Sequence, residues 1–362
     1  MSDRSQIAAR AAQLRVRFEA AGGLVVDPPL LQPAGTLLDL YGEDIRARAY
    51  VTSDALRGEQ MLRPDFTVPV VQMHMSEGAE PARYTYCGEV FRRQELDPDR
   101  ANEYVQVGYE VFDREDSAAA DAEVFSLFAL QLRGLPLRAA TGDIGILMAA
   151  VQGLNTTDKR KSALMRHIWR PRRFRALLDR YVGRTPIPES RKALLSTEGD
   201  LLGSAVIIGK RSAAEVRDRI DVLRADAAAA PIDEKEIVAL EALMAVRETV
   251  PYAIERMRDI AVDLPSIIPA LDRLDARTAA MKARGVDVDN LDFEASYGRT
   301  SMEYYDGFVF GFYAETRPDL PSIASGGRYD ALTWHLGRGA EIPAVGGVIR
   351  PDLILEIEET RT

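Results

Sequence analysis

The feature that most constrains the fold is a series of strand-like segments that a long helical stretch interrupts. Strand patterns occupy Ala82 to Arg92 and Glu103 to Phe112, and they return at Gly307 to Tyr313 and Val345 to Ile349. From about Gly142 to Leu274 the apolar spacing is mostly helical. We therefore predict an α+β fold in which an antiparallel sheet, flanked by helices, carries a helical insertion.

Shorter patterns add detail to this outline. Alternation in Tyr84 to Phe91 places Cys87 among packed strand residues, so we expect a buried thiol and not a reactive one. Helices are expected from about Ile7 to Ala21 and from Ala118 to Leu132. Further strands are expected at Leu24 to Leu31, broken by Pro28 and Pro29, at Arg48 to Val51, at Glu59 to Arg63 and at Asp292 to Tyr297.

Composition excludes several classes of protein. A single cysteine excludes an internal disulfide, and the three histidines show no metal-ligand spacing. The N-terminus lacks the pattern of a signal peptide, and no run of about 18 apolar residues is present. We predict a cytoplasmic protein without a metal or cofactor.

The charge is acidic overall but basic in one segment. The net charge of −10 argues only weakly against a nucleic-acid binder, whose surface is usually basic, because a local basic patch is compatible with an acidic total. Lys159 to Arg180, however, holds nine Lys/Arg residues and only one acid, Asp179. This segment is either a solvated helix face or a docking surface for an acidic partner or a phosphate-rich ligand.

Polar side chains alternate in two segments that we read as strands. In Leu62 to Thr67, the side chains of Asp65 and Thr67 would share a strand face. In the second segment Gln106 and Glu110 flank a glycine, which indicates that something approaches the backbone closely. The alternatives are a solvated strand edge for the first segment and, for the second, a buried Glu110 whose hydrogen bonds are satisfied, for example by an arginine.

A free amino acid presents an ammonium and a carboxylate, so its site needs acidic acceptors at one end and donors at the other. Each charge-assisted hydrogen bond contributes ~1.5–3 kcal/mol. Asp65, Gln106, Glu110 and Arg92 are of the right types. These residue types alone do not tell which amino acid would bind.

Two later segments carry glycine and aromatic residues. Gly326 and Gly327 permit backbone geometry that is closed to other residues, although a simple turn is the alternative. Tyr304 and Tyr305 could wall a planar ligand, although a packed aromatic strand explains them equally well.

Together these segments resemble the class II aminoacyl-tRNA synthetases in their histidyl form. The segment FRRQELDPDRANEYVQVGYEVFD (Phe91 to Asp113) resembles motif 2, with Arg92 and Arg100 at its two arginine positions. SGGRYDAL (Ser325 to Leu332) and EYYDGFVF look like the two histidine-specific segments, and Pro28-Pro29 fits the motif 1 region that forms the dimer interface. The resemblance implies a class II synthetase-like core at about 1–142 and 275–362, with a mostly helical insertion at about 143–274.

The resemblance also implies a histidine-binding site. Its residues would be Asp65, Thr67, Arg92, Gln106, Glu110, Tyr304, Tyr305, Gly326, Gly327 and Tyr329. Asp65, in place of the usual glutamate, and Thr67 would hold the ammonium group. Gln106 would contact the backbone end of histidine, and Arg92 would face the carboxylate or, in a synthetase, the α-phosphate.

The imidazole would be read by Glu110, Tyr305 and Tyr329. Because Glu110 is the expected imidazole partner, its replacement by alanine is predicted to weaken histidine binding.

Departures from the synthetase pattern argue against adenylation. Thr300 stands where the histidine-specific arginine is expected, with Arg299 one residue too early, and Gln94 replaces the motif 2 glutamate. Arg350 to Leu353 replaces the motif 3 sequence whose arginine stacks on adenine, and leucine has no planar cation for that contact. Only ten residues follow Asp352, too few for an anticodon-binding domain.

This combination is similar to the regulatory subunits of ATP phosphoribosyltransferase, the synthetase-like partners of a short catalytic subunit. The family implies a non-catalytic homodimer within a hetero-oligomer, required for the first step of histidine biosynthesis and for feedback control by histidine. One alternative is a truncated synthetase-like enzyme that adenylates histidine or a related acid. Another is a tRNA- or protein-binding scaffold that uses Lys159 to Arg180.

Overall fold

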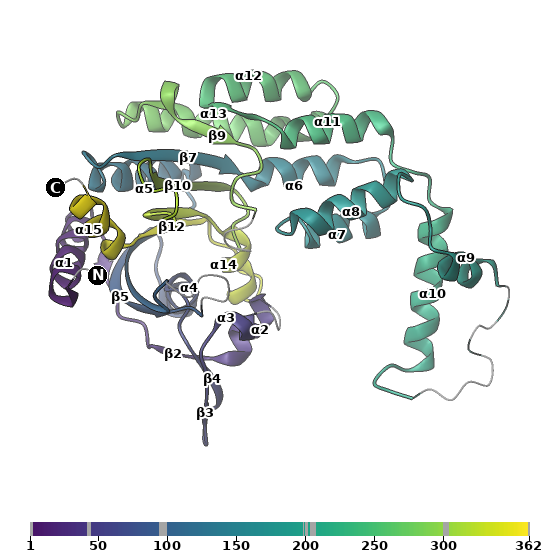
Figure 1. Cartoon of the computed structure of the whole chain (residues 1–362), viewed down its shortest axis with the longest axis horizontal. Coiled ribbons are helices and arrows are strands. Elements are labelled where there is room, and N and C mark those ends of the chain that lie inside the picture. The colour runs from purple at the N-terminus through teal and green to yellow at the C-terminus, as the bar shows by residue number, and fades with distance from the viewer. Residues whose placement is uncertain are drawn as a thin grey trace.

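The protein is built around one large, mostly antiparallel sheet. The computed structural model describes residues 3–41, 45–93, 100–197, 199, 202, 208–299 and 304–360. Within these residues the sheet has nine strands in the order β1-β5-β6-β12-β11-β10-β7-β9-β8 (Figure 1). The pairs β1–β5 and β7–β9 are parallel and the others are antiparallel. The strands are β1 Leu24–Val25, β5 Ala82–Phe91, β6 Glu103–Phe112, β7 Leu137–Asp143, β8 Arg247–Thr249, β9 Asp292–Glu294, β10 Phe308–Ala314, β11 Ala324–Arg328 and β12 Ala344–Ile349.

A second, three-stranded sheet in the order β2-β4-β3 projects from this body (Figure 1). Its strands are β2 Leu31–Pro33, β3 Val51–Asp54 and β4 Gly58–Leu62. The helices are α1 Arg4–Ala20, α2 Ala34–Tyr41, α3 Ile45–Arg48, α4 Thr67–Glu77, α5 Ser117–Gln131, α6 Ile144–Gly153, α7 Asp158–Arg166, α8 Pro171–Val182, α9 Glu189–Ser196, α10 Ala213–Ala228, α11 Glu234–Met244, α12 Val250–Ile260, α13 Ile268–Ala283, α14 Asp330–Leu336 and α15 Pro351–Thr360.

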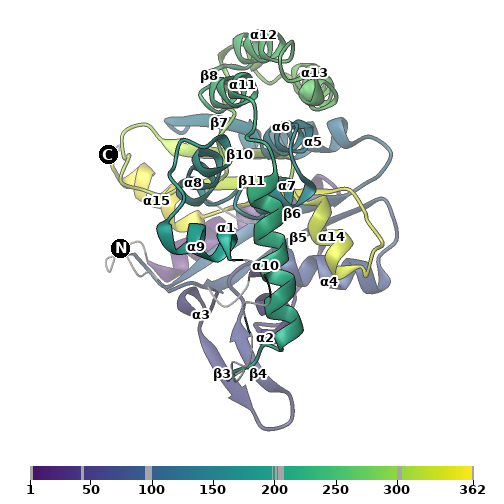
Figure 2. The same ribbon diagram turned by 90° about the vertical axis from the view of Figure 1, so that its right-hand side faces the viewer.

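Most helices pack near the large sheet, and two of them extend away from it. In Figure 1, α11, α12 and α13 lie along the β7–β9 side, whereas α9 and α10 extend away from the sheet as an arm. Figure 2 shows α10 standing in front of the body in the perpendicular view.

Aromatic packing joins α5 to the middle of the sheet. The Phe125 ring lies 5.6 Å from that of Phe310 and 5.5 Å from that of Phe312, both on β10. The Phe128 ring lies 5.5 Å from Phe310. Fully burying a side chain of this type contributes about 1.5–3 kcal/mol, so this contact accounts for much of the stability of the layer.

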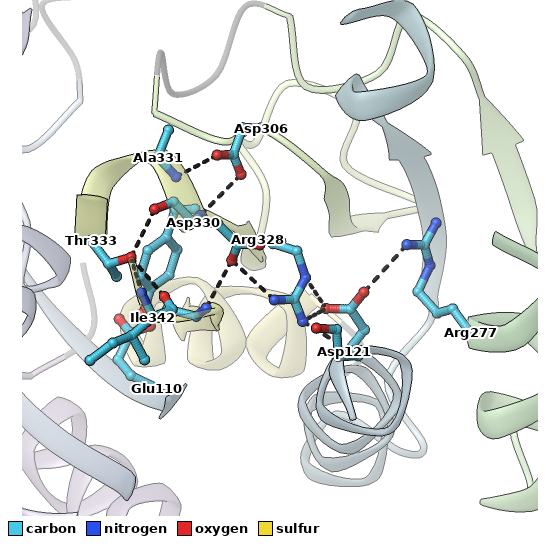
Figure 3. A network of polar contacts seen from close by, with 12 residues as sticks. Glu110, Asp121, Arg277, Asp306, Arg328, Asp330, Ala331, Thr333 and Ile342 are labelled. Carbon is cyan, nitrogen blue, oxygen red and sulfur yellow. Dashed lines mark hydrogen bonds and ion pairs between the residues drawn. The ribbon is translucent and has the colours of Figure 1, made fainter. Parts of the chain in front are cut away.

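A buried chain of ion pairs ties α13 and α5 to β11 (Figure 3). Asp121 on α5 lies between Arg277, at 3.3 Å, and Arg328, at 2.7 Å. Arg277 also pairs with Asp143 at 2.8 Å, and Arg328 with Asp330 at 3.0 Å. Because removing one partner would leave an uncompensated buried charge, the chain fixes these elements relative to one another.

The predicted fold class is confirmed, but local predictions differ from the structure. The strand predicted for Leu62 to Thr67 is wrong, because β4 ends at Leu62 and α4 begins at Thr67. The two adjacent glycines at 326 and 327 lie within β11 and not in a turn. β7 was not predicted.

The predicted insertion, 143–274, contains α6 to α12 but also β8, which joins the large sheet. Its predicted end at residue 274 falls inside α13. The division of the chain into core and insertion stays a prediction.

Candidate functional site

A cavity of about 160 Å³ opens beside β6, β11 and β12. Its wall contains six of the ten predicted site residues: Asp65, Thr67, Arg92, Gln106, Tyr304 and Tyr305. The rest of the wall is formed by Tyr104, residues 321–325, Gly347, Val348 and Arg350. Segments far apart in the sequence thus meet at one small hollow, as the resemblance implied.

Glu110 lies beneath this cavity and does not line it. Its carboxylate accepts hydrogen bonds from the hydroxyls of Thr67, at 3.1 Å, Tyr86, at 2.8 Å, and Tyr329, at 2.6 Å. Gly346 on the neighbouring strand makes room for it, since a Cβ there would lie 1.5 Å from Oε2. Glu110 is thus a satisfied buried glutamate, as the alternative predicted, but within the described residues hydroxyls and not an arginine supply the donors.

The environment of Glu110 shifts its ionisation. Burial raises the pKa of Glu110 to about 7, although the three hydroxyl donors oppose the shift, and the nearby Asp65 carboxylate adds to it. Burial also raises the pKa of the Tyr86 and Tyr329 phenols well above the usual range. The region below the cavity is therefore acidic and poised to change charge near neutral pH.

The close approach predicted at Gly108 comes from the chain itself. A Cβ at Gly108 would lie 2.1 Å from Cζ of Tyr86, so the glycine admits the Tyr86 ring. That ring stacks on Phe66 with centroids 4.3 Å apart. Sequence reasoning missed Tyr86, although it lies directly opposite Gly108 in the β5–β6 pairing.

The segment between β4 and α4 is held by backbone contacts. The buried Arg63 donates to the carbonyl of Glu89 at 2.9 Å, and Arg92 donates to that of Pro64 at 2.7 Å. Oδ1 of Asp65 accepts from the amide of Val68 at 3.3 Å. These bonds present Asp65 to the cavity from a tight bend and not from a strand face.

Gly326, Gly327 and Tyr329 also lie outside the cavity wall. A Cβ at Gly327 would lie 2.9 Å from the Tyr305 ring, so this glycine leaves room for a wall residue. Tyr329 acts on Glu110 through its hydroxyl. Among the predicted site residues, these three and Glu110 support the wall from behind.

Arg350 was treated only as a departure from a motif, yet it lines the cavity. Its guanidinium carbon lies 4.0 Å from the ring centroid of Tyr104 and it donates to Asp352 at 2.8 Å. Its position directly before the proline that opens α15 is the sequence signal that could have identified it. The cavity therefore has two guanidinium groups, from Arg92 and Arg350, in addition to the carboxylate of Asp65.

Arg299 does not take over the missing arginine position in the cavity. It is buried, donates to the carbonyl of Ile168 at 2.8 Å and lies 4.8 Å over the Phe174 ring. Thr300 and Gln94, the other two departures, lie outside the described residues.

Other sequence predictions concern chemistry that the site does not use. Cys87 lies on β5, partly buried, and burial raises the pKa of its thiol, which agrees with a packed strand residue. No group of three potential metal ligands occurs in the described parts of the chain. Among the helices described, none is long and apolar enough to cross a membrane.

Comparison with known proteins gives one consistent family. The family model described as histidyl-tRNA synthetase matches residues 2–218 and 209–354. Two curated proteins, from Brucella ovis and Brucella abortus, are both called ATP phosphoribosyltransferase regulatory subunit. Each is 31% identical to this chain over 92% of its residues, and the alignment covers 93% of the first protein and 92% of the second.

Solved structures show the same fold. A Bacillus halodurans structure described as an ATP phosphoribosyltransferase regulatory subunit/histidyl-tRNA synthetase aligns with a TM-score of 0.67 at 21% identity, over 99% of this chain and 81% of that one. A histidine–tRNA ligase subunit from Alicyclobacillus acidocaldarius aligns with a TM-score of 0.61 at 23% identity, over 100% and 96%. The chain thus has the class II histidyl-tRNA synthetase-like core, and it belongs to the family of ATP phosphoribosyltransferase regulatory subunits.

Proposed function

We propose that this chain is a non-catalytic subunit that joins the catalytic subunit of ATP phosphoribosyltransferase, a glycosyltransferase, and senses histidine for feedback control. The observation that carries the proposal is the similarity to regulatory subunits along nearly the whole chain. In this role the chain is required for the first step of histidine biosynthesis without performing chemistry itself. We expect a homodimer within the hetero-oligomer.

The charges around the cavity support an amino-acid ligand. Asp65 suits an ammonium group, whereas Arg92 and Arg350 suit a carboxylate. Each such charge-assisted hydrogen bond contributes ~1.5–3 kcal/mol. Three of them together contribute about 4.5–9 kcal/mol, from which the entropy cost of binding is subtracted.

The groups next to Asp65 favour histidine among amino acids. Tyr304 and Tyr305 form an aromatic wall, with ring centroids 4.9 Å apart, against which a planar ring can pack. Thr67 belongs both to the wall and to the hydrogen bonds of Glu110. A ligand N–H bonded to Thr67 would therefore gain from the Glu110 charge, and an imidazole, with a pKa near 6.5, matches a carboxyl whose pKa is about 7.

The size of the cavity favours binding over adenylation. Pockets for drug-sized ligands usually measure about 300–1,000 Å³, and this cavity measures about 160 Å³. That volume suits one amino acid and not an amino acid together with a nucleotide. The second candidate, a truncated synthetase-like enzyme that adenylates histidine or a related acid, is favoured only by the two guanidinium groups, which could bind phosphate.

The deciding experiment is phosphoribosyl-ATP formation by a short catalytic subunit from the same organism, with and without this chain. We expect activity only when both proteins are present, and inhibition by added histidine. Asp65→Asn should keep the activation and lose the inhibition, and Asp259→Asn, on the exposed surface of α12, should behave as the wild type. No activation by the wild-type chain would refute the proposal, and histidine-dependent pyrophosphate–ATP exchange would establish the enzymatic alternative instead.

A further inference from the structure

The second chemical feature of the molecule is the basic segment, which forms α7 and α8 and the turn between them (Figure 1). Three of its arginines, Arg166, Arg172 and Arg173, are exposed, and within the described residues they have no acidic partner. We call these three residues the basic face.

Neighbouring cations of the same segment are neutralised. Arg160 is buried and pairs with Asp226 at 2.7 Å. Arg175 lies 3.1 Å from Glu241. Among the described residues, acids thus pair with the cations beside the basic face but not with the face itself.

His167, in the turn, is influenced by two arginines of the basic face, Arg166 and Arg173, and by Arg170. Burial lowers the pKa of its imidazole, and the guanidinium groups of Arg170, Arg173 and Arg166 lower it further. The chain as a whole has a net charge of −10, so this positive region is a local exception. Clustered like charges repel one another, and an acidic surface brought against them would relieve that repulsion.

The same turn contacts the wall of the cavity. The indole N–H of Trp169 donates to the carbonyl of Tyr305 at 3.3 Å. One residue earlier, the carbonyl of Ile168 accepts from Arg299 at 2.8 Å. A shift of Tyr305 on ligand binding would therefore change the position of Trp169 and of the turn that bears the basic face.

We propose that the basic face docks an acidic surface of a partner protein, and that the Trp169–Tyr305 contact couples this docking to occupancy of the cavity. The inference rests on the proposed function, in which the partner is the catalytic subunit. A protein suits the face better than a nucleic acid does. The three arginines of the basic face would neutralise few phosphates compared with a protein that makes about 6–10 phosphate contacts, and the chain is acidic overall.

The test compares two charge-reversal variants of equal net charge. The first carries Arg166→Glu, Arg172→Glu and Arg173→Glu. The control carries Arg57→Glu, Arg273→Glu and Lys282→Glu, which are exposed positions outside α7 and α8 and have no side-chain partner in the described chain. Dissociation constants for the catalytic subunit are measured at two salt concentrations, and histidine binding to each free variant by calorimetry verifies that it is folded.

We expect the basic-face variant to bind the catalytic subunit at least tenfold more weakly, with a reduced salt dependence, and the control to bind within about twofold of the wild type. Equal losses in both variants, or none in either, would overturn the inference while leaving the proposed function intact. If the wild-type chain itself does not bind the catalytic subunit, the proposed function fails. Binding of tRNA that only the basic-face variant loses, with binding of the catalytic subunit unchanged, would also overturn the inference.

The coupling is tested separately with Trp169→Phe, which removes the N–H donor and keeps an aromatic ring. In the wild type, we expect the affinity for histidine to differ between the free chain and the complex by about 5–150-fold, a typical allosteric coupling. In Trp169→Phe this ratio should move toward one, with histidine affinity of the free chain within about twofold of the wild type. An unchanged ratio would refute the link through Trp169.

Discussion

Replacing Glu110 by glutamine should change how the stability of the protein depends on pH. The pKa of Glu110 is about 7 in the folded chain, against an ordinary value of 4.5 for a glutamate side chain. Between these values the folded state binds more protons than the unfolded state, so the contribution of Glu110 to stability is complete below pH 4.5 and is lost as pH rises through 7. A shift of this size corresponds to about 3 kcal/mol in total, most of which is lost between pH 5 and pH 8. Glutamine cannot ionise, so Glu110→Gln removes this dependence.

The assay is urea unfolding of both proteins at pH 5, 6, 7 and 8. The free energy of unfolding of the wild type, minus that of Glu110→Gln, should fall steadily by about 2–3 kcal/mol across this range. Burial also raises the pKa of Asp306 to about 7, but Asp306 is present in both proteins, so its contribution to the free energy of unfolding cancels in the difference. The replacement also changes the hydrogen bonds of Thr67, Tyr86 and Tyr329. That change adds the same amount to the difference at every pH and leaves its dependence on pH unaltered. A difference that does not vary with pH would refute the assignment of a buried, poised carboxyl.

Three further results follow from the contacts of the site and its support. Gly346→Ala would place a methyl group 1.5 Å from the Glu110 carboxylate, so we expect a loss of about 1–3 kcal/mol in urea unfolding, together with weakened histidine binding in calorimetry. Asp121→Ala should lower the free energy of unfolding by about 1–3 kcal/mol, because it removes one of the two carboxylates that pair with each of the buried Arg277 and Arg328; a loss under 1 kcal/mol would contradict a stabilising role for Asp121. Asp65→Asn should weaken histidine binding about tenfold or more by calorimetry, and unchanged affinity would place the ammonium elsewhere.

Sequence periodicity predicted those strands whose side chains alternate in size and polarity. β5 and β6 matched closely because aromatic and β-branched residues recur along both. β7 was not predicted because small residues interrupt the alternation of apolar and polar side chains along it. They are small for a tertiary reason, since a Cβ at Gly142 would lie 2.7 Å from the carbonyl of Glu294. For the two adjacent glycines of β11 a simple turn was the alternative prediction, but they lie in the sheet, where Phe310 and Tyr305 fill the space beside them.

The residue types of the site could be predicted from the sequence, but not which residues line the cavity and which lie behind its wall. The resemblance named the six residues that line the cavity and the four that lie behind them, but it did not separate the two groups. Asp65 and Thr67 reach the cavity from a bend and a helix start, because Arg63 and Arg92 bind carbonyls around that bend. Such backbone contacts leave no periodic trace in a sequence.

The wall near the start of α15 supports the proposal that this cavity binds an amino acid and not a nucleotide. The Arg350 guanidinium covers the Tyr104 ring at 4.0 Å and is held by Asp352 at 2.8 Å. A base that stacked on Tyr104 would have to displace this cation, at a cost of about 0.5–2 kcal/mol for the cation–π contact and a broken ion pair besides. Leu353 is buried in the core and has no charge to replace it. A carboxylate meets Arg350 without displacing it, so the residue that departs from the synthetase pattern favours a bound zwitterion and disfavours a nucleotide.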